Sequence, residues 1–281
     1  MPYPRYLNAL WLIVALCCQS GCLSPSMLNV VISDKHYRVT PDQFYGTHVR
    51  QRLDVYEPTL ASTIPAKVVV FFYGNQWQIG SKTDYQFVAE ALTAQGFVVV
   101  IPDYRAYPFA RFPAFVEDAA AALRWVHQNI QDHNGDPDLI YLLGHSAGAH
   151  IAALLTLDKR YAVAPMVRGM IGLAGLYDFL PLNSLDLQAT FEPAARLEET
   201  QPIYFVDGSN PPMLLLSGDN DKTVNPGNSL RLAARIREKG GSVQLILYPG
   251  VGHLLILTAL APPLQTWAPT LFDITQFIKR Y

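Results

Sequence analysis

The segment spanning residues 139–148 constrains the fold of this chain more than any other. Five residues suited to a buried strand, 139–143, run directly into the pattern Gly144-x-Ser146-x-Gly148, and residues suited to a helix follow. A serine at such a strand-to-helix turn sits on a sharp corner that lifts its hydroxyl above the sheet. Glycine on either side suits a corner where a side chain would collide with the adjoining strand or helix. We therefore interpret Ser146 as a nucleophile rather than as part of a chance match in a loop.

Backbone N–H groups near Ser146 could bind a negatively charged oxygen. Ala147 begins the predicted helix, and unpaired N–H groups at a helix N-terminus favour negative charge. We expect a second donor from the loop 73–80, which follows another strand-like run. Gly74 in this loop permits a close approach of the backbone, and Asn75 is among the few non-glycine residues that tolerate a left-handed conformation. The alternative for this loop is an ordinary connection.

Strand-like and helix-like segments alternate along most of the chain. Buried-strand runs occupy residues 67–72, 97–101, 139–143, 169–173, 213–216 and 243–247, and the alternating segment 51–58 indicates an edge strand. Helical patterns occupy residues 84–95, 113–130, 147–157, 226–239 and 269–281. This alternation predicts an α/β fold with a mostly parallel, doubly wound sheet and helices on both faces.

The chain is long enough for one large domain. It has 281 residues and 50% hydrophobic content, which suits a single buried core. We predict a leader over residues 1–22, a tether and first strand over 23–44, and one α/β domain over 45–281. Residues 178–212 interrupt the alternation with prolines and short helical pieces, and we interpret them as a small cap insertion over the sheet edge.

Composition excludes several classes of function. The net charge is −2 and no basic run is present, so we expect no nucleic-acid partner. All three cysteines lie within the first 22 residues, so the rest of the chain has no disulfide and no thiolate metal site. The seven histidines show no spacing typical of metal ligands, and we expect neither a metal nor a cofactor. These features leave the oligomeric state open.

The N-terminal segment that ends at Cys22 resembles an export signal. Arg5 precedes an apolar run over residues 7–18, which is short for a bilayer span but typical of a secretory signal peptide. A glycine before Cys22 resembles the end of a bacterial lipoprotein signal, although Gln19 stands where an aliphatic residue is usual. We expect an exported protein, held at the periplasm or outer membrane through lipidated Cys22. Cleavage by an ordinary signal peptidase, giving a secreted protein, and an uncleaved anchor are the alternatives.

A serine hydroxyl needs a base within hydrogen-bond reach and a group that orients this base. In parallel sheets such groups collect beyond the carboxyl ends of the strands. His253 follows the last predicted strand in a glycine-rich turn, and we interpret it as the base rather than as a solvent-facing residue. Asp219 and Asp221 both follow the preceding strand; we favour Asp221 as the orienting group, with Asp219 as the alternative. We expect the other six histidines to be structural or surface residues, with His145 pointing away from the nucleophile.

Together these motifs resemble those of α/β-hydrolase-fold carboxylesterases, in the bacterial esterase/lipase group related to hormone-sensitive lipase and kynurenine formamidase-like hydrolases. The resemblance runs from about Tyr45 to the C-terminus. Its markers are residues 45–46, 53–58, 73–77, 102–105, 112–114, 117–119, 144–148, 218–224 and 252–253. The chain departs from the family pattern at Tyr73, which replaces a histidine, and at Asn75, which replaces a glycine.

The resemblance implies a serine hydrolase that cleaves small carboxylic esters through an acyl-enzyme, without a cofactor. The triad that it implies is Ser146, Asp221 and His253. The oxyanion donors that it implies are Gly74, Asn75 and Ala147. Membrane contact is expected only through the lipid anchor. The alternatives are an amidase, formamidase or peptidase with the same triad, and a non-catalytic surface protein that retains the fold.

Overall fold

The computed structural model describes residues 25–31, 36–60, 62–78, 80–192 and 194–281. The predicted leader and Cys22 lie outside the described residues. Within the described ranges, no helix is both long enough and apolar enough to cross a bilayer.

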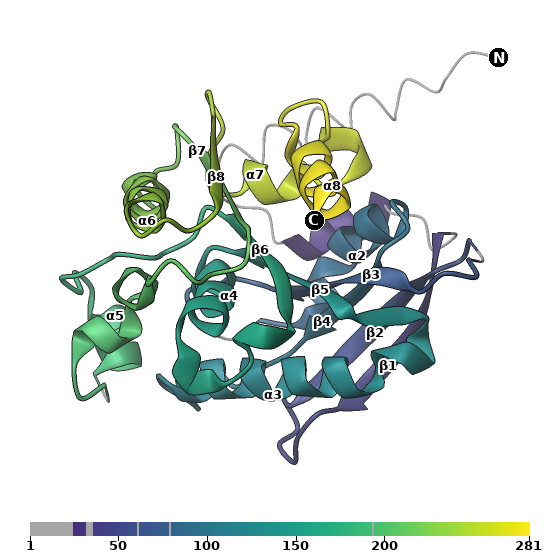
Figure 1. Ribbon diagram of the computed structural model, residues 1–281, viewed down its shortest axis with the longest axis horizontal. Coiled ribbons are helices and arrows are strands. Elements are labelled where there is room, and N and C mark those ends of the chain that lie inside the picture. Colours follow the sequence, from purple (N-terminus) through teal and green to yellow (C-terminus); the bar gives the residue numbers. More distant parts are fainter. Residues whose placement is uncertain (1–24, 32–35, 61, 79, 193) are drawn as a thin grey trace.

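Eight strands of the described chain form one sheet in the order β1-β2-β4-β3-β5-β6-β7-β8 (Figure 1). The pairings of β2 with β1 and with β4 are antiparallel, and the other pairings are parallel. The strands are β1 (Tyr37–Phe44), β2 (Arg52–Pro58), β3 (Ala66–Phe72), β4 (Val98–Pro102), β5 (Gly135–His145), β6 (Val167–Leu173), β7 (Met213–Gly218) and β8 (Val243–Tyr248). The predicted mostly parallel sheet is therefore confirmed.

The predicted edge position of residues 51–58 is wrong. β2 pairs on one side with β1 and on the other with β4, so β1 forms this edge of the sheet. The polar residue Asp54, which makes the segment look half exposed in the sequence, is only 3% exposed. Its carboxylate is instead paired with Lys82 inside the protein. The polar residue at position 54 in this alternating segment therefore marks a buried ion pair and not a strand face that is open to solvent.

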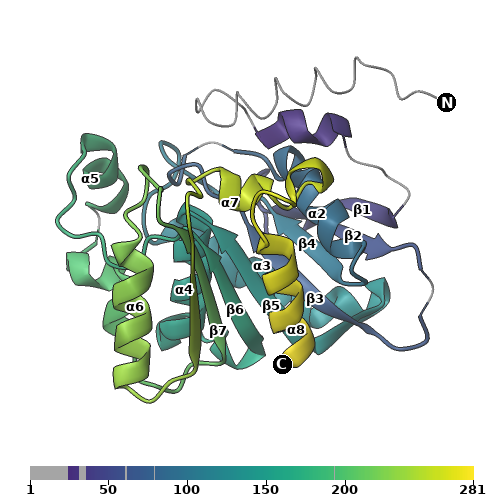
Figure 2. The same cartoon turned by 90° about the horizontal axis from the view of Figure 1, so that it is seen from above.

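Helices cover both faces of the sheet, as predicted. α2 (Gln86–Thr93) and α8 (Thr270–Arg280) pack together on one face, and α3 (Ala114–Asn129), α4 (Ala147–Leu157) and α6 (Gly227–Glu238) lie on the other (Figure 1). Each of these helices begins and ends within two residues of its predicted bounds. The short helix α7 (Leu255–Thr258), which the sequence did not predict, lies beyond the end of β8 (Figure 2).

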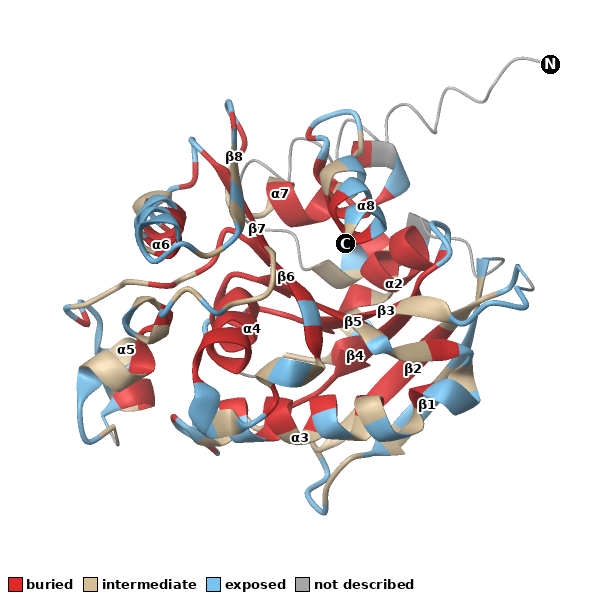
Figure 3. Cartoon of the chain, in the orientation of Figure 1, coloured by how far each residue is buried: buried red, intermediate tan, exposed pale blue. Residues whose placement is uncertain are grey.

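The central strands are buried on both faces. Every residue of β4 and of β7 is buried, because helices on both sides leave no solvent for an alternating polar residue to face. Figure 3 shows this buried layer and the exposed outer sides of α3, α6 and α8. α4 is buried along its whole length, which explains why it is built from small and aliphatic residues.

Residues Pro25–Val31 form a 3-10 helix, where the sequence predicts a tether. Leu28 in this helix is buried in the core. The Asn29 amide donates to the Thr83 carbonyl at 2.8 Å and accepts from the Phe87 N–H at 3.1 Å. The bond to Phe87 satisfies a backbone N–H at the start of α2 that has no partner within the helix. The sequence near Asn29 does not predict this contact, because the partner lies far along the chain.

The insertion at residues 178–212 contains α5 (Leu185–Phe191) and two 3-10 turns, Leu197–Thr200 and Pro202–Phe205. The second turn packs against α4 and α6, on the sheet face that these helices cover. Phe191 is fully buried, with its ring centroid 4.9 Å from that of Trp77. The aromatic residue thus joins the insertion to the loop after β3.

Asp54 of β2 and Lys82 form a buried ion pair, and the half-exposed Asp42 is a third member. Lys82 is only 3% exposed, and its Nζ lies 2.5 Å from Asp54 Oδ1 and 2.9 Å from Asp42 Oδ1. Asp54 Oδ1 also accepts the backbone N–H of Asp42 at 2.9 Å. Removing one member of a buried ion pair leaves an uncompensated charge away from water, so these residues depend on one another.

We predict that Lys82→Met lowers the free energy of unfolding by about 3–5 kcal/mol, because Asp54 stays buried without its counter-charge. Guanidinium denaturation followed by tryptophan fluorescence measures this loss. Lys159→Met is the control, since Lys159 pairs with Asp207 on an exposed surface, and it should cost less than about 1 kcal/mol. Equal losses in the two variants would contradict the role of burial.

His150 in α4 is completely buried and links three parts of the fold. Trp77 Nε1–H donates to its Nδ1 at 3.2 Å, and its Nε2–H donates to the Thr200 carbonyl at 2.7 Å. Because an indole only donates and a carbonyl only accepts, both bonds require a neutral ring with its proton on Nε2. Burial lowers the pKa of His150 to about 4, which keeps the ring neutral.

A histidine whose pKa falls from 6.5 to about 4 on folding stabilises the protein above pH 6.5. This stability is lost as the pH falls from 6.5 towards 4, because in this range only the unfolded chain takes up the proton. The free energy of unfolding falls by at most about 1.4 kcal/mol per pH unit. We expect His150→Gln to make the fall in unfolding free energy between pH 6.5 and 4.5 shallower. The exposed His48→Gln serves as the control and should keep the parent slope; an unchanged slope in His150→Gln would refute the prediction.

Candidate active site

Ser146 occupies the sharp turn between β5 and α4. Its backbone has φ 55° and ψ −121°, a conformation that is rare for a residue with a side chain and is typical of strained functional sites. A Cβ on Gly144 would collide with the backbone of Gly148, and a Cβ on Gly148 would collide with the carbonyl of Phe72. The turn therefore requires both glycines, as the sequence predicted.

The structure brings Ser146, His253 and Asp221 together. Ser146 Oγ lies 3.0 Å from His253 Nε2, and His253 Nδ1 lies 2.8 Å from Asp221 Oδ2. A carboxylate only accepts, so the His253 proton is on Nδ1 and the lone pair of Nε2 faces the serine hydroxyl. In this arrangement the hydroxyl can give its proton to the ring.

Asp221 is held in place by its other oxygen. Oδ1 accepts the backbone N–H groups of Thr223 and Val224, each at 2.8 Å. Burial raises the pKa of the Asp221 carboxyl, but the bond from His253 and these two N–H bonds outweigh it and hold the pKa below its ordinary value. The group is therefore an anion that can stabilise a charged imidazole.

Asp219, the alternative orienting residue, has a different position. Its Oδ1 accepts the backbone N–H of Gly250 at 2.7 Å, in the turn that leads to His253. Gly250 has φ 73°, a left-handed conformation that glycine adopts at little cost. Asp219 therefore holds the turn before His253. In the described part of the chain, its carboxylate makes no hydrogen bond to the His253 ring.

His145 has a role that the sequence did not reveal. The expected structural role is confirmed, but the sequence does not show that the ring lies beside the base, with its centroid 4.8 Å from that of His253. Its Nε2–H donates to the backbone carbonyl of His253 at 3.0 Å. Burial and the neighbouring His253 lower the pKa of His145 to about 3, so its ring is a neutral donor that holds the His253 backbone.

The loop after β3 lies against the nucleophile. A Cβ on Gly74 would meet the carbonyl of His145 at 2.9 Å and the Cβ of Ser146 at 3.0 Å, so only glycine allows this approach. Asn75 has φ 74°, the left-handed conformation that its residue type was expected to tolerate. The next two residues, Gln76 and Trp77, also have positive φ (53° and 56°), which the sequence did not suggest.

Ala147 is the first residue of α4 and is fully buried. The N–H groups of a first helical turn have no partner within the helix, so the Ala147 N–H is available to a bound oxygen. The predicted donors Gly74, Asn75 and Ala147 thus belong to two segments that meet at Ser146.

Tyr73, the departure from the family pattern, is anchored behind this loop. Its hydroxyl donates to Asp103 Oδ1 at 2.8 Å and accepts from Arg50 Nη2 at 2.9 Å. Burial raises the pKa of Tyr73 well above its ordinary value, so the hydroxyl keeps its proton and remains a donor. The side chain therefore ties the start of the loop to the segment after β4.

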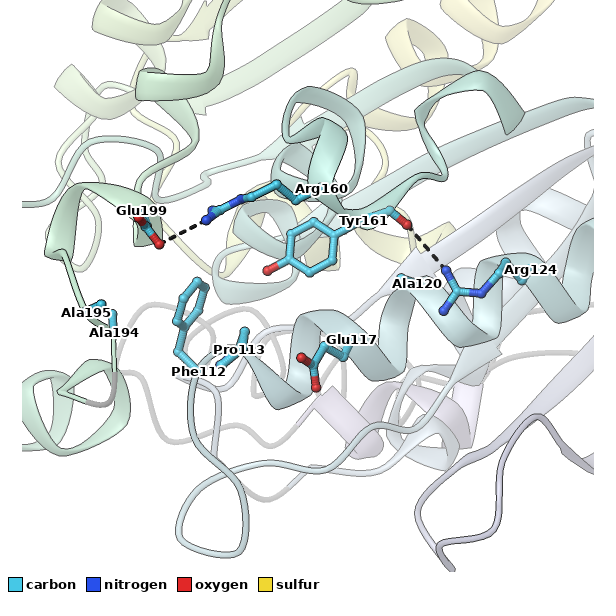
Figure 4. Close-up of a pocket in the computed structure, with 10 residues that line it drawn as sticks. All are labelled: Phe112, Pro113, Glu117, Ala120, Arg124, Arg160, Tyr161, Ala194, Ala195 and Glu199. Carbon is cyan, nitrogen blue, oxygen red and sulfur yellow. Dashed lines mark hydrogen bonds and ion pairs between the residues drawn. The ribbon is translucent and has the colours of Figure 1, made fainter.

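A separate pocket of about 520 Å³ lies between α3, the turn after α4 and the insertion (Figure 4). None of the three triad residues lines it. Arg160 on its wall is paired with Glu199 at 2.9 Å, and Arg124 donates to the Tyr161 carbonyl at 3.4 Å. Arg160 and Glu199 thus neutralise each other on this wall.

Sequence comparison relates the chain to known hydrolases. Residues 53–236 match the BD-FAE family model. The chain is 30% identical to isoprenylcysteine alpha-carbonyl methylesterase ICME of Arabidopsis thaliana over 302 residues, which cover 96% of this chain and 70% of the relative. It is 34% identical to kynurenine formamidase of Salmo salar over 185 residues, 63% of this chain and 61% of the relative. The probable methylesterase ICMEL1 of Arabidopsis thaliana is matched over only 56% of its length.

Solved structures share the fold. A Pyrobaculum calidifontis esterase superposes with a TM-score of 0.76 at 22% identity, and the match covers 99% of both chains. A truncated carbohydrate esterase from gut microbiota gives 0.77 at 22% identity, covering 89% of this chain and 98% of that one. The family model spans well over half of the sequence, and this chain therefore belongs to the BD-FAE family, with the α/β-hydrolase fold of esterases.

Proposed function

We propose that this protein hydrolyses small carboxylic esters through an acyl-enzyme. The observation that carries the proposal is the continuous chain of hydrogen bonds from Asp221 through His253 to Ser146, at 2.8 and 3.0 Å. A neutral imidazole placed between an anion and a hydroxyl is the arrangement that activates a serine. The esterases among the relatives and structural neighbours support the same reaction class.

In the proposed reaction, Ser146 Oγ attacks the ester carbonyl carbon while its proton moves to His253 Nε2. The carbonyl oxygen becomes an oxyanion, which the N–H groups of Ala147, Gly74 and Asn75 stabilise. His253 then protonates the leaving alcohol, and the carbon–oxygen bond to that alcohol breaks. Water, deprotonated by His253, releases the acid and regenerates the serine. Asp221 holds the ring tautomer and stabilises the imidazolium.

Amide cleavage by the same residues is a second candidate. The relative named kynurenine formamidase, 34% identical over its matched region, is the observation that favours it. The same nucleophile and base serve both reactions, and the difference lies in protonation of a poorer leaving group.

We predict that Ser146→Ala abolishes hydrolysis of p-nitrophenyl acetate and labelling by a fluorophosphonate probe, because both require the Oγ nucleophile. The soluble chain that starts after Cys22 is assayed with this ester and with the matched p-nitroacetanilide. Each rate is divided by the uncatalysed rate for the same substrate, because the ester is intrinsically more reactive than the anilide. A larger rate enhancement for the ester supports the first candidate, and a larger one for the anilide supports the second. Labelling retained in Ser146→Ala, or a wild-type protein that neither reacts nor is labelled, would overturn the proposal.

We also propose that the protein is exported and anchored through a lipid on Cys22. The support is the sequence alone: an apolar run after Arg5, followed by small residues before the cysteine. Two or more acyl chains would bind a membrane firmly, since each buried methylene contributes about 0.8 kcal/mol.

We predict that Cys22→Ser moves the expressed protein from the membrane fraction to the soluble fraction and abolishes incorporation of labelled palmitate. Cys17→Ser is the control, because Cys17 lies within the apolar run and should leave both readouts unchanged. A wild-type protein that takes up no label would show that the cysteine is not lipidated.

A further inference from the structure

The hydroxyl of Tyr104 contacts the start of the loop after β3, which carries the predicted oxyanion donors Gly74 and Asn75. It donates to the carbonyl of Tyr73 at 2.8 Å and lies 3.4 Å from the carbonyl of Gly74. Tyr104 follows the end of β4 and is fully buried. Burial raises its pKa well above the ordinary value, so the hydroxyl keeps the proton that it donates.

The two carbonyls that Tyr104 contacts belong to the peptide groups of the predicted donors. In a trans peptide the C=O of one residue and the N–H of the next point in opposite directions. A group that holds the Tyr73 and Gly74 carbonyls therefore directs the N–H groups of Gly74 and Asn75 away from itself. A Cβ on Gly74 would lie 3.0 Å from the Cβ of Ser146, so this part of the loop lies against the nucleophile.

We propose that Tyr104 is a positioning residue for the oxyanion hole: its hydroxyl fixes the orientation of the Gly74 and Asn75 N–H groups. This inference rests on the proposed serine-hydrolase function. It assigns to Tyr104 an effect that acts through the backbone, without contact with the substrate.

The surroundings keep the Tyr104 hydroxyl in one place. Its ring stacks on that of Tyr73, with centroids 4.8 Å apart and planes inclined by 21°. Tyr85 stacks on Tyr73 as well, at 5.1 Å and 7°. Tyr73 itself is fixed by Asp103 and Arg50. The hydroxyl is thus placed by packing, and the loop backbone follows from it.

The oxyanion exists in the transition state and not in the bound ester. Misdirected donors should therefore lower kcat and leave KM nearly unchanged. Loss of one oxyanion donor typically lowers kcat by about 100- to 1,000-fold. Removal of the Tyr104 hydroxyl leaves the N–H donors present but poorly oriented. We therefore expect kcat to fall by about 10- to 100-fold, which is less than the loss of a whole donor would cause.

The test compares Tyr104→Phe with Tyr85→Phe in the full-length mature protein. Both changes remove one hydroxyl from a tyrosine near Tyr73, but only Tyr104 donates to the Tyr73 carbonyl. With p-nitrophenyl esters, we expect Tyr104→Phe to lower kcat by about 10- to 100-fold with KM within about 2-fold. Tyr85→Phe should keep kcat within about 3-fold of the parent value, as expected for a change that leaves transition-state contacts intact.

A trifluoromethyl ketone gives a second readout. Ser146 Oγ adds to its carbonyl carbon while the hydroxyl proton moves to His253, and the product carries an oxyanion like that of the transition state. Its affinity should fall in Tyr104→Phe by the same factor as kcat, whereas the pH profile of kcat/KM should stay unchanged, because the triad is intact. Amide signals of Gly74 and Asn75 in NMR spectra should shift in this variant, which tests the orientation even if its stability is reduced.

The outcomes separate the two proposals. Parent-like kcat in Tyr104→Phe, an equal loss in Tyr85→Phe or a change in KM alone would overturn the role of Tyr104 while ester hydrolysis by the parent stands. A parent protein without esterase or amidase activity would overturn the proposed function, and the role of Tyr104 would fall with it.

Discussion

The close contact between the end of β3 and the start of α4 is the constraint on which the rest of the site depends. Gly148 lies directly against the carbonyl of Phe72, and Gly74 lies against the backbone before Ser146. β3 and β5 pair in parallel up to Phe72 and Gly144, so both segments leave the sheet at the same level. A side chain at either glycine would push the loop away from the nucleophile. Backbone packing thus sets the distance between the serine and its expected oxyanion donors.

The reacting groups lie on turns. Residues that take no part in the proposed reaction hold the turn at His253 and the loop after β3 through hydrogen bonds. Asp219 binds the turn before His253, and His145 binds the His253 backbone. His150 binds Trp77 at the far end of the loop after β3. Both buried histidines have lowered pKa values, so both rings are neutral: His145 donates to the His253 carbonyl, and His150 accepts from the Trp77 indole N–H. His145 therefore adds no positive charge beside the His253 ring. An imidazolium forming on His253 therefore meets the Asp221 anion without a competing charge.

Sequence periodicity predicted most of the fold because strand and helix patterns are local. It failed where a distant residue decides the environment: Asp54 looks solvent-facing until Lys82 is placed beside it. The same distinction applies to the site. Ser146, His253 and Asp221 follow strands in recognisable motifs, and their meeting follows from the parallel sheet. His145 and Tyr104 have no such signal, because their function depends on which backbone carbonyl lies opposite them. Tyr104 lies in the family marker 102–105 and just after a strand that neighbours β3, but neither feature shows which carbonyl its hydroxyl meets.

Tyr73 illustrates how a departure from a family pattern can leave the chemistry intact. Replacing a histidine that takes part in the reaction would abolish the reaction. The Tyr73 side chain takes no such part, because its hydroxyl bonds to Asp103 and Arg50. The position therefore needs a flat side chain that reaches the buried Asp103 and the half-buried Arg50, and a tyrosine stacked against Tyr104 meets both demands. What the site requires of Tyr73 is the direction of its carbonyl, which Tyr104 holds. The identity of a residue at such a position is thus free to change, provided that the backbone it carries keeps its orientation.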